Sequence, residues 1–346
     1  MSRWAVVLAG GIGSRFWPLS TPERPKQLLP LVTENPLLVD SIDRLRAIVD
    51  AEHTLVLTNG NLKKPIGKLI ADLPAENIVA EPRPAGTAAA LTWAALNIEQ
   101  RDSPNATMIC IHADWAIGDN ELFRETLIAA EEVAEKNNSL VTVGIVPTRA
   151  DPGFGYIQAE DAPAGKPSRV KRFVEKPDRA RAEQMRRDGY LWNSGIFVWR
   201  VGDFLDEVRK HTPELAAALR QGVKAGTERF FANVEVPLSV DVGVLERSSK
   251  VMVLPGDFGW DDIGTWAALR RVRDKDKAGN VTTGNAHFLD AGNNVVHADS
   301  GQVVMYGVND LVVVTKNGLT LVTTTDKASD LKRLIESLSA PELGES

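Results

Sequence analysis

The chain has 346 residues, a formal net charge of −6 and one cysteine, Cys110. The negative charge argues against a broad basic surface for nucleic acid, and a single cysteine excludes both an intrachain disulfide and a thiolate metal site. No apolar run approaches the roughly eighteen residues that a membrane span needs, and the short apolar run at residues 5–9 is no signal peptide. We therefore expect a cytoplasmic, soluble protein that binds neither nucleic acid nor a membrane, with one large domain and a smaller appendage.

Short apolar runs alternate with helical patterns along the first part of the chain. The expected strands are residues 4–9, 54–58, 78–80, 107–112 and 140–146, and the expected helices are residues 37–49, 66–73, 87–100 and 122–136. Alternation of this kind predicts an α/β fold with a doubly wound, mixed and mostly parallel sheet, as in Rossmann-like domains. Ligands of such sheets bind where the strands end, so the residues that follow each strand are candidate site residues.

The rest of the chain divides into two parts. Strands at residues 155–158, 170–174 and 195–199 and helices at residues 179–187, 201–211 and 260–273 complete a large domain, predicted to span residues 1–278. Beyond Gly279, short β-rich pieces alternate with turn signals such as Asn317-Gly318. They predict stacked turns, a small β-helix or β-roll over residues 279–346, with a final helix at residues 326–338.

The first expected strand leads into a glycine-rich segment with two cations. This segment contains Gly10, Gly11 and Gly13, followed by Arg15 and Lys26. Glycines let main-chain N–H groups approach a phosphate, and cations neutralise the charge that develops on a leaving phosphate group. The Gly-Lys-Ser/Thr of a P-loop and the third glycine of a dinucleotide fingerprint are both missing. The segment is typical of triphosphate handling, with an ordinary turn as the alternative.

Two aspartates stand at positions that suit metal binding. Asp114 closely follows the strand expected at residues 107–112, and Asp262 lies at the start of a helical pattern. Two carboxylates from distant parts of a chain can hold one Mg²⁺ against phosphate oxygens while water completes the coordination. A turn or helix-capping role is the alternative for each aspartate.

Several short motifs resemble those of a known family. Gly10-Gly-x-Gly-x-Arg15 followed by Pro25-Lys26 resembles the signature of the sugar-phosphate nucleotidyltransferases, and residues 16–19 with Lys26-Gln27 resemble the mannose-1-phosphate guanylyltransferase branch. The further matches, in order, are Glu81-Pro82 with Gly86-Thr87-Ala88, His112-Ala-Asp114, residues 153–157, 173–178 and 193–197, Ser239-Val-Asp241 with Glu246, and residues 260–266. Each motif is weak alone, but together they cover nearly the whole chain in the family's order.

The resemblance implies a reaction and a set of site residues. The reaction is transfer of GMP from GTP to mannose 1-phosphate, which gives GDP-mannose and pyrophosphate with Mg²⁺ as the cofactor. Arg15, Lys26, Asp114 and Asp262 would be catalytic, and the two aspartates would hold Mg²⁺. The implied nucleotide-binding residues are Leu8, Ala9, Gly10, Gly11, Gly13, Gly86 and Thr87. The implied sugar-phosphate-binding residues are Gly155, Glu175, Lys176 and Asn193.

The family also implies a short left-handed β-helix at the C-terminus, which is often used in dimers, so a homodimer is expected. Two positions depart from the branch pattern. Gly86 stands where the branch has an asparagine, and Trp115 stands where a histidine usually follows Asp114. Another sugar 1-phosphate or nucleoside triphosphate therefore stays open as the substrate.

Two alternatives come from other functional classes. A metal-dependent glycosyltransferase shares the sheet, and Asp261-Asp262 loosely imitates its acidic motif, but it has no use for Arg15 and Lys26 after the first strand. A catalytically inactive nucleotide-sugar sensor would be expected to lose one of the cations or metal carboxylates, and all four are present.

Overall fold

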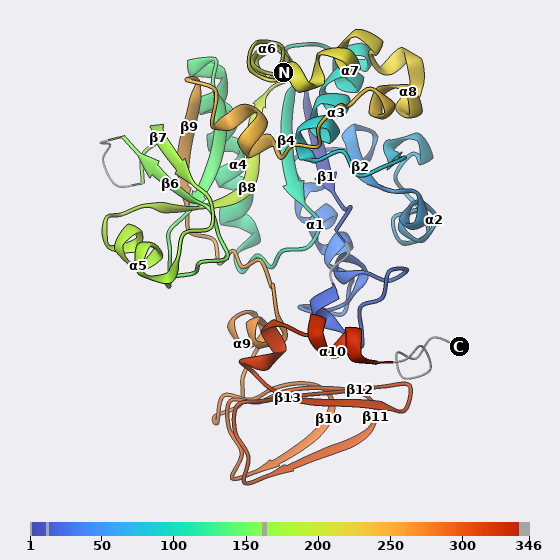
Figure 1. Cartoon of the computed structure of the whole chain (residues 1–346), viewed down its shortest axis with the longest axis vertical. Helices are drawn as coiled ribbons and strands as arrows, with labels where there is room; N and C mark the ends of the chain where they lie inside the picture. Colours follow the sequence, from blue (N-terminus) through green and yellow to red (C-terminus); the bar gives the residue numbers. More distant parts are fainter. Residues whose placement is uncertain (1, 12–13, 161–164, 339–346) are drawn as a thin grey trace. The chain divides into compact units, whose positions relative to one another are not determined.

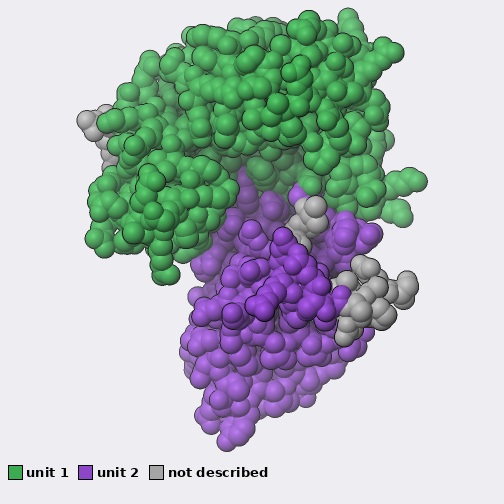
Figure 2. Space-filling view, viewed as in Figure 1, with its two compact units in different colours: residues 1–10, 42–113, 119–260 green, residues 11–41, 114–118, 261–346 purple. Residues whose placement is uncertain are grey.

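The structure is a computed structural model that describes residues 2–11, 14–160 and 165–338. The chain forms two compact units, and each is assembled from separate segments (Figure 2). Unit 1 comprises residues 1–10, 42–113 and 119–260, and unit 2 comprises residues 11–41, 114–118 and 261–346. The sequential boundary expected at residues 278 and 279 stays a prediction.

Unit 1 is built on a nine-stranded sheet with the order β3-β2-β1-β4-β8-β5-β9-β7-β6 (Figure 1). Its strands are β1 (Arg3–Leu8), β2 (Thr54–Asn59), β3 (Ile78–Glu81), β4 (Thr107–His112), β5 (Leu140–Ile145), β6 (Tyr156–Ala159), β7 (Ser168–Val174), β8 (Leu191–Arg200) and β9 (Val251–Gly256). Strands β3, β2, β1 and β4 are mutually parallel, whereas β8 is antiparallel to both β4 and β5. The predicted mixed α/β sheet is confirmed, and β9 is a strand that the sequence did not reveal.

Both faces of this sheet are buried. In β1, Trp4, Val6 and Leu8 join the apolar cluster formed with α3 and α6, while the intervening Ala5 and Val7 are buried as well. Successive side chains of a strand point to opposite faces, so these five residues bury both of them. The helices of the chain are α1 (Leu37–Leu45), α2 (Gly60–Leu69), α3 (Thr87–Arg101), α4 (Asn120–Asn137), α5 (Arg179–Arg187), α6 (Val201–His211), α7 (Ala216–Gln221), α8 (Gly226–Ala232), α9 (Leu269–Val272) and α10 (Lys332–Ser337).

Unit 2 contains a second sheet of four strands (Figure 1). They are β10 (Val281–Leu289), β11 (Val295–Tyr306), β12 (Leu311–Lys316) and β13 (Leu319–Thr324). β10, β11 and β12 pair in parallel along the chain, and β13 returns antiparallel to β12. Parallel pairing of consecutive strands across short turns is what the predicted stacked turns require.

Four predicted helices have other bounds in the structure. The helix expected at residues 37–49 ends at Leu45, and the one expected at residues 66–73 is Gly60–Leu69. The other two are interrupted. The helix expected at residues 260–273 begins only at a 3₁₀ turn, Trp266–Ala268, because Ile263 adopts a positive φ of 45° that interrupts a helix. The final helix expected at residues 326–338 is divided into a 3₁₀ turn, Lys327–Ser329, and α10. Asp330 separates the two with φ −136° and ψ 86°, which is not helical.

Candidate active site

Lys26 is buried at the beginning of a 3₁₀ turn, Lys26–Leu28, and its ammonium group joins two segments of unit 2. Only 7% of the residue is exposed. Nζ donates to Oδ2 of Asp114 at 3.0 Å and also to the main-chain carbonyl oxygen of Asp262. Lysine is seldom buried without a partner, and here a carboxylate and a carbonyl compensate its charge. Positions 26, 114 and 262, which are far apart in the sequence, therefore lie together, and their catalytic and metal-binding roles stay predictions.

The neighbouring aspartate, Asp261, has a different environment from Asp262. Its main chain pairs with Ala116 through two hydrogen bonds, of 2.9 and 3.1 Å. Its carboxylate is buried, accepts both Nε and Nη2 of Arg271 at 2.5 and 2.8 Å, and also accepts the amide of Ile263. Asp261 thus has a structural role, which leaves Asp262 as the better candidate for binding a ligand.

Arg15 and the carboxylate of Asp262 lie close to Gly264. A Cβ atom added to Gly264 would stand 2.8 Å from Oδ2 of Asp262 and 3.5 Å from Nη1 of Arg15. The absence of a side chain therefore lets a cation and a carboxylate approach the same point. The preceding residue, Ile263, is fully buried in a left-handed conformation that costs free energy for a β-branched residue. Such backbone outliers cluster at functional sites.

The glycine-rich segment is partly described. Gly10 and Gly11 are exposed, and a Cβ at either would meet no atom within 4 Å, so their main chain is open to a ligand. The side chain of Gln27 fixes the carbonyl of Gly11 through a hydrogen bond of 2.9 Å. Upstream, Leu8 ends β1, and the main chain of Ala9 is anchored by Leu57 and Thr58 of β2. The predicted site residue Gly13 lies outside the described residues.

Gly86 and Thr87 begin α3 and pack on the segment around Leu238. Gly86 has a φ of 82°, and a Cβ there would lie 2.1 Å from the carbonyl oxygen of Leu238. The hydroxyl of Thr87 accepts the amide of Val240 at 2.8 Å. In this conformation the chain therefore has no space for a side chain at residue 86. Nucleotide contacts by these two residues stay a prediction.

Gly155, Glu175 and Asn193, three of the predicted sugar-phosphate residues, lie together in unit 1. A Cβ at Gly155 would stand 2.8 Å from Oε2 of Glu175 and 3.5 Å from Cβ of Asn193. The main-chain amide of Asn193 donates to the carbonyl of Gly155 at 2.9 Å. The fourth residue, Lys176, has a φ of 41° and pairs with Glu175 through side chains that are 65% and 52% exposed. An ion pair this exposed contributes little stability.

Asp241 is a member of this cluster to which the sequence assigned no role. Its carboxylate accepts the side-chain amide of Asn193 at 2.7 Å and so orients that amide. Burial raises the pKa of Asp241, and the negative charge of Glu175 raises it further. The pKa of Glu246 is raised in the same way, by burial and by the charges of Asp241 and Glu175. The cluster is therefore acidic and only partly compensated.

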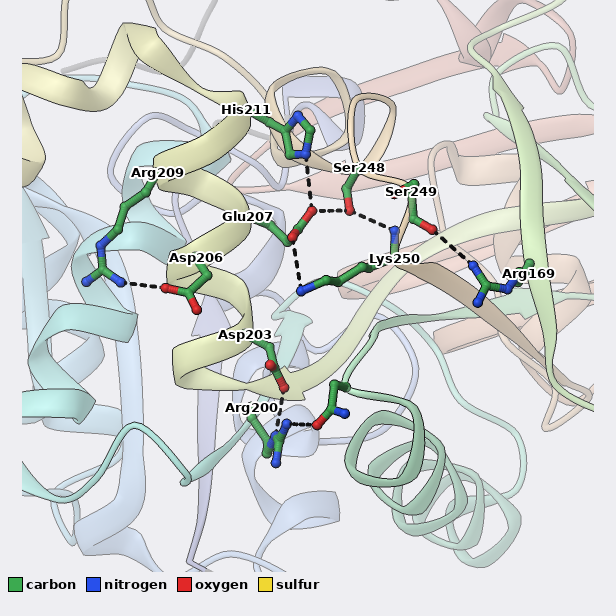
Figure 3. A network of polar contacts seen from close by, with 11 residues as sticks. Arg169, Arg200, Asp203, Asp206, Glu207, Arg209, His211, Ser248, Ser249 and Lys250 are labelled. Carbon is green, nitrogen blue, oxygen red and sulfur yellow. Dashed lines mark hydrogen bonds and ion pairs between the residues drawn. The ribbon is translucent and has the colours of Figure 1, made fainter.

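Asp241 begins a π-helical turn, Asp241–Leu245, and the segment that follows is anchored by α6. The buried carboxylate of Glu207 on α6 accepts Ser248 Oγ at 2.6 Å and lies 3.4 Å from Nζ of Lys250 and 3.3 Å from Nε2 of His211 (Figure 3). Downstream of α6, Thr212 donates to the carbonyl of Gly243 at 2.7 Å. π-helical turns are often found at functional sites, and this one is held on both sides.

The described residues contain no group of three or more His, Cys, Asp or Glu side chains that could hold a metal ion. Asp114 and Asp262 offer two half-exposed carboxylates. Mg²⁺ commonly binds proteins through one or two carboxylates and takes its other ligands from phosphate and water. The donor set therefore fits Mg²⁺ that arrives with a phosphate ligand better than a metal held by the protein alone.

Comparison with known proteins shows the family to which the chain belongs. The family described as nucleotidyl transferase matches residues 4–279. The chain belongs to the nucleotidyl transferase family. A second family, described as the MannoseP isomerase/GMP-like β-helix domain, matches residues 284–338, which confirms the β-helix-like C-terminal fold.

Curated relatives and solved structures agree with this membership of the nucleotidyl transferase family. A mannose-1-phosphate guanylyltransferase of Klebsiella pneumoniae is 34% identical over 98% of this chain and 74% of its own length. The alginate biosynthesis protein AlgA of Pseudomonas aeruginosa is 34% identical over 97% of this chain and 72% of its own. A crystal structure from Thermus thermophilus, named mannose-1-phosphate geranyltransferase, has 34% identity and a TM-score of 0.88 over 97% of this chain and 99% of that one.

Among the helices that the structure describes, none is both long and apolar enough to cross a membrane.

Proposed function

We propose that this nucleotidyl transferase transfers GMP from GTP to mannose 1-phosphate. A phosphate oxygen of the sugar 1-phosphate forms a bond to the α-phosphorus of GTP, the bond from that phosphorus to the β-phosphate oxygen breaks, and pyrophosphate leaves. The attacking oxygen is already anionic near neutral pH, so the reaction needs no general base. The relatives named mannose-1-phosphate guanylyltransferase support this choice of substrates.

The observation that carries the proposal is the buried ammonium of Lys26 between Asp114 and Asp262. Phosphoryl-type transfer depends on positioning and on neutralising charge rather than on covalent chemistry by the protein. Lys26 and Arg15 supply two cations in the unit that also holds both aspartates. Their proposed role is to bind the phosphates of GTP and to stabilise the negative charge of the departing pyrophosphate.

Asp114 and Asp262 are the proposed ligands of Mg²⁺. When bound, the ion would neutralise phosphate charge at the reacting centre. Removal of divalent ions with EDTA is expected to abolish turnover, and Mg²⁺ in excess of the chelator is expected to restore it. Turnover that persists at full rate in EDTA would remove the metal from the proposal.

Selection of guanine is proposed to involve Glu81. This residue ends β3 in register with Asn59 of β2, and β2 adjoins the strand that leads into Gly10. Within the described residues its carboxylate has no hydrogen-bond or ion-pair partner, and burial raises its pKa to about 7. An ionised carboxylate can accept both N1–H and the 2-amino group of guanine.

This role of Glu81 can be tested with nucleotide analogues. Wild-type protein is expected to prefer GTP over inosine triphosphate, which lacks the 2-amino group, and Glu81→Gln is expected to reduce the preference. The KM for GTP should rise as the pH falls below about 7, because protonation removes an acceptor from the carboxyl group. An unchanged GTP-to-ITP ratio in Glu81→Gln would contradict the assignment.

The activity itself is tested by a matrix of nucleoside triphosphates against sugar 1-phosphates, with pyrophosphate release as the readout. GTP with mannose 1-phosphate is expected to give the highest kcat/KM. A glycosyltransferase would release a nucleoside diphosphate instead. That alternative is disfavoured because Asp261 is bound by Arg271, so Asp261 and Asp262 do not form a paired acidic motif.

The C-terminal sheet supports a further proposal, that the protein is a homodimer. Leu289 and Tyr306 are paired neighbours on β10 and β11, and with Val304 they are 54%, 69% and 64% exposed. Adjacent exposed apolar side chains favour burial against another surface. Sedimentation of the wild type and of a Val304→Lys, Tyr306→Lys double variant is expected to give a dimer and a monomer, respectively.

A further inference from the structure

Unit 2 contains a cavity that brings one predicted catalytic residue together with the C-terminal segment. Its volume is about 460 Å³. The lining residues are Arg15, Ser329, Asp330, Leu331, Lys332, Ile335 and Glu336. Among these described residues, Arg15 is therefore the one that comes from outside residues 329–336.

Packing explains why Arg15 faces this segment. The residues that follow Arg15, Phe16 and Trp17, belong to an apolar cluster that also contains Leu331, which is 4% exposed. Ile335 of α10 packs against the same cluster. Because Phe16 and Leu331 share a core, their neighbours Arg15 and Lys332 are brought to the cavity from two different parts of the chain.

The charges around the cavity can be rearranged at little cost. Nζ of Lys332 lies 3.7 Å from Oε1 of Glu336, and the two side chains are 81% and 65% exposed. Such a solvated pair is weak, so a better anionic ligand can replace Glu336 as the partner of Lys332. Asp330, in contrast, accepts the main-chain amide of Lys332 at 3.3 Å. The formal charges of the lining cancel, since Asp330 and Glu336 balance Arg15 and Lys332. Once Glu336 is displaced, Arg15 and Lys332 can both pair with a ligand that carries two adjacent negative charges.

We propose that this cavity binds a diphosphate group, with Lys332 joining Arg15 as the second cation. The group would be the β- and γ-phosphates of the nucleoside triphosphate or free pyrophosphate, which share this chemistry. The inference rests on the proposed function in naming these ligands. It adds to that function a contribution from the C-terminal domain, which a β-helix-like fold does not by itself suggest.

The test uses Lys332→Ala in the full-length protein. The KM for pyrophosphate in the reverse reaction is expected to rise roughly five- to tenfold, the loss of one charge-assisted contact at a solvated site. The KM for GDP-mannose should stay unchanged. In the forward direction, an increased KM for GTP would show that the bound nucleotide also uses the cavity, whereas an unchanged one would restrict it to free pyrophosphate.

Two further variants make the test specific. Glu336→Gln removes the competing carboxylate and is expected to lower the KM for pyrophosphate, opposite in sign to Lys332→Ala. Arg333→Ala removes a cation from the same helix that does not line the cavity, and it is expected to change nothing. The inference would be overturned if Lys332→Ala and Arg333→Ala changed the KM for pyrophosphate equally. It would also be overturned if neither Lys332→Ala nor Glu336→Gln changed that KM.

A binding measurement separates this inference from the proposed activity. Calorimetric titration of pyrophosphate into the wild type and Lys332→Ala needs no turnover. If the wild type binds pyrophosphate more tightly than the variant, the cavity assignment holds even if GDP-mannose is not the product. If the wild type makes GDP-mannose and both proteins bind pyrophosphate equally, the cavity assignment fails and the activity stands.

Discussion

A cluster of charged residues in unit 2 and another in unit 1 differ in how far the negative charges of their carboxylates are compensated. In unit 2, the carboxylate of Asp114 is paired with Lys26, and Asp262 lies close to Arg15. In unit 1, Asp241 and Glu246 have raised pKa values because burial and neighbouring carboxylates outweigh the partners they have. A site for phosphate needs cations, whereas a site for sugar hydroxyls can use carboxylates as hydrogen-bond acceptors. The contrast is consistent with the proposed division of the site into a part that binds phosphate and a part that binds the sugar.

The largest expected effect comes from breaking the paired cluster at Lys26. Lys26→Ala should lower kcat by about 100-fold or more, because a preorganised cation contributes several kcal/mol to a charged transition state. Circular dichroism is expected to show an intact fold, and Lys136→Ala on the surface of α4 serves as the matched control. Wild-type turnover in Lys26→Ala would remove Lys26 from the catalytic group.

A matched pair of glycine substitutions compares the two clusters directly. Alanine at Gly264 would crowd the carboxylate of Asp262, and alanine at Gly155 would crowd that of Glu175, each at 2.8 Å from an oxygen. We expect Gly264→Ala to lower kcat and weaken the dependence on Mg²⁺. We expect Gly155→Ala to raise the KM for mannose 1-phosphate about tenfold or less, because the longer, exposed side chain of Glu175 can move away.

The two glycine variants should therefore affect different kinetic parameters. Steady-state kinetics with each substrate varied in turn, at several Mg²⁺ concentrations, provides the measurement. If both variants changed the same parameter, the assignment of one cluster to phosphate and the other to sugar would be wrong.

The smallest expected effect is on thermal stability and concerns Asp241 in the partly compensated cluster of unit 1. Asp241→Asn keeps an acceptor for Asn193 but removes a charge whose folded-state pKa is raised. A carboxyl group with a raised pKa destabilises the fold once the pH exceeds its unfolded pKa, and this cost is relieved as the pH falls. The Tm of Asp241→Asn should therefore exceed that of the wild type by a few degrees at pH 7.5 and match it near pH 4. A variant that is less stable at pH 7.5 would show that the charge is compensated.

Much of the fold is predictable because its strands and helices have strong local patterns. β4 is found at the residues expected for it, as are α5 and α6, since their apolar spacing and flanking polar residues agree. β9 was missed because Pro255 stands within a short apolar run. Residues 326–338 were predicted as one helix because their apolar spacing is helical, and this spacing does not reveal the non-helical conformation of Asp330.

For the candidate site, the sequence indicated candidate residues but not the long-range contacts that they make. The aspartates and cations of unit 2 were predicted from motif and strand position. The structure brings Lys26, Asp114 and Asp262 into contact, and their roles stay predictions. The structural role of Asp261 and the conformation of Gly86 depend on Arg271 and Leu238, which are distant in sequence. The hydrogen bond from Asn193 to Asp241 spans 48 residues and is likewise invisible in a single sequence. The only indication of Asp241 in the sequence analysis was the motif Ser239-Val240-Asp241, which resembles a motif of the family.

The composition of unit 2 has a consequence for biosynthesis. Phe16, Trp17 and Leu19, which lie between Arg15 and Lys26, bury their side chains with Val312, Leu321 and Leu331 from the C-terminal segment of unit 2. Lys316 also donates to the carbonyl of Leu19. A nascent polypeptide emerges from the ribosome amino end first, so Phe16, Trp17 and Leu19 meet Val312, Leu321 and Leu331 only after the whole of unit 1 has been synthesised. Unit 2 can therefore complete its core only after the chain has passed through unit 1 and returned.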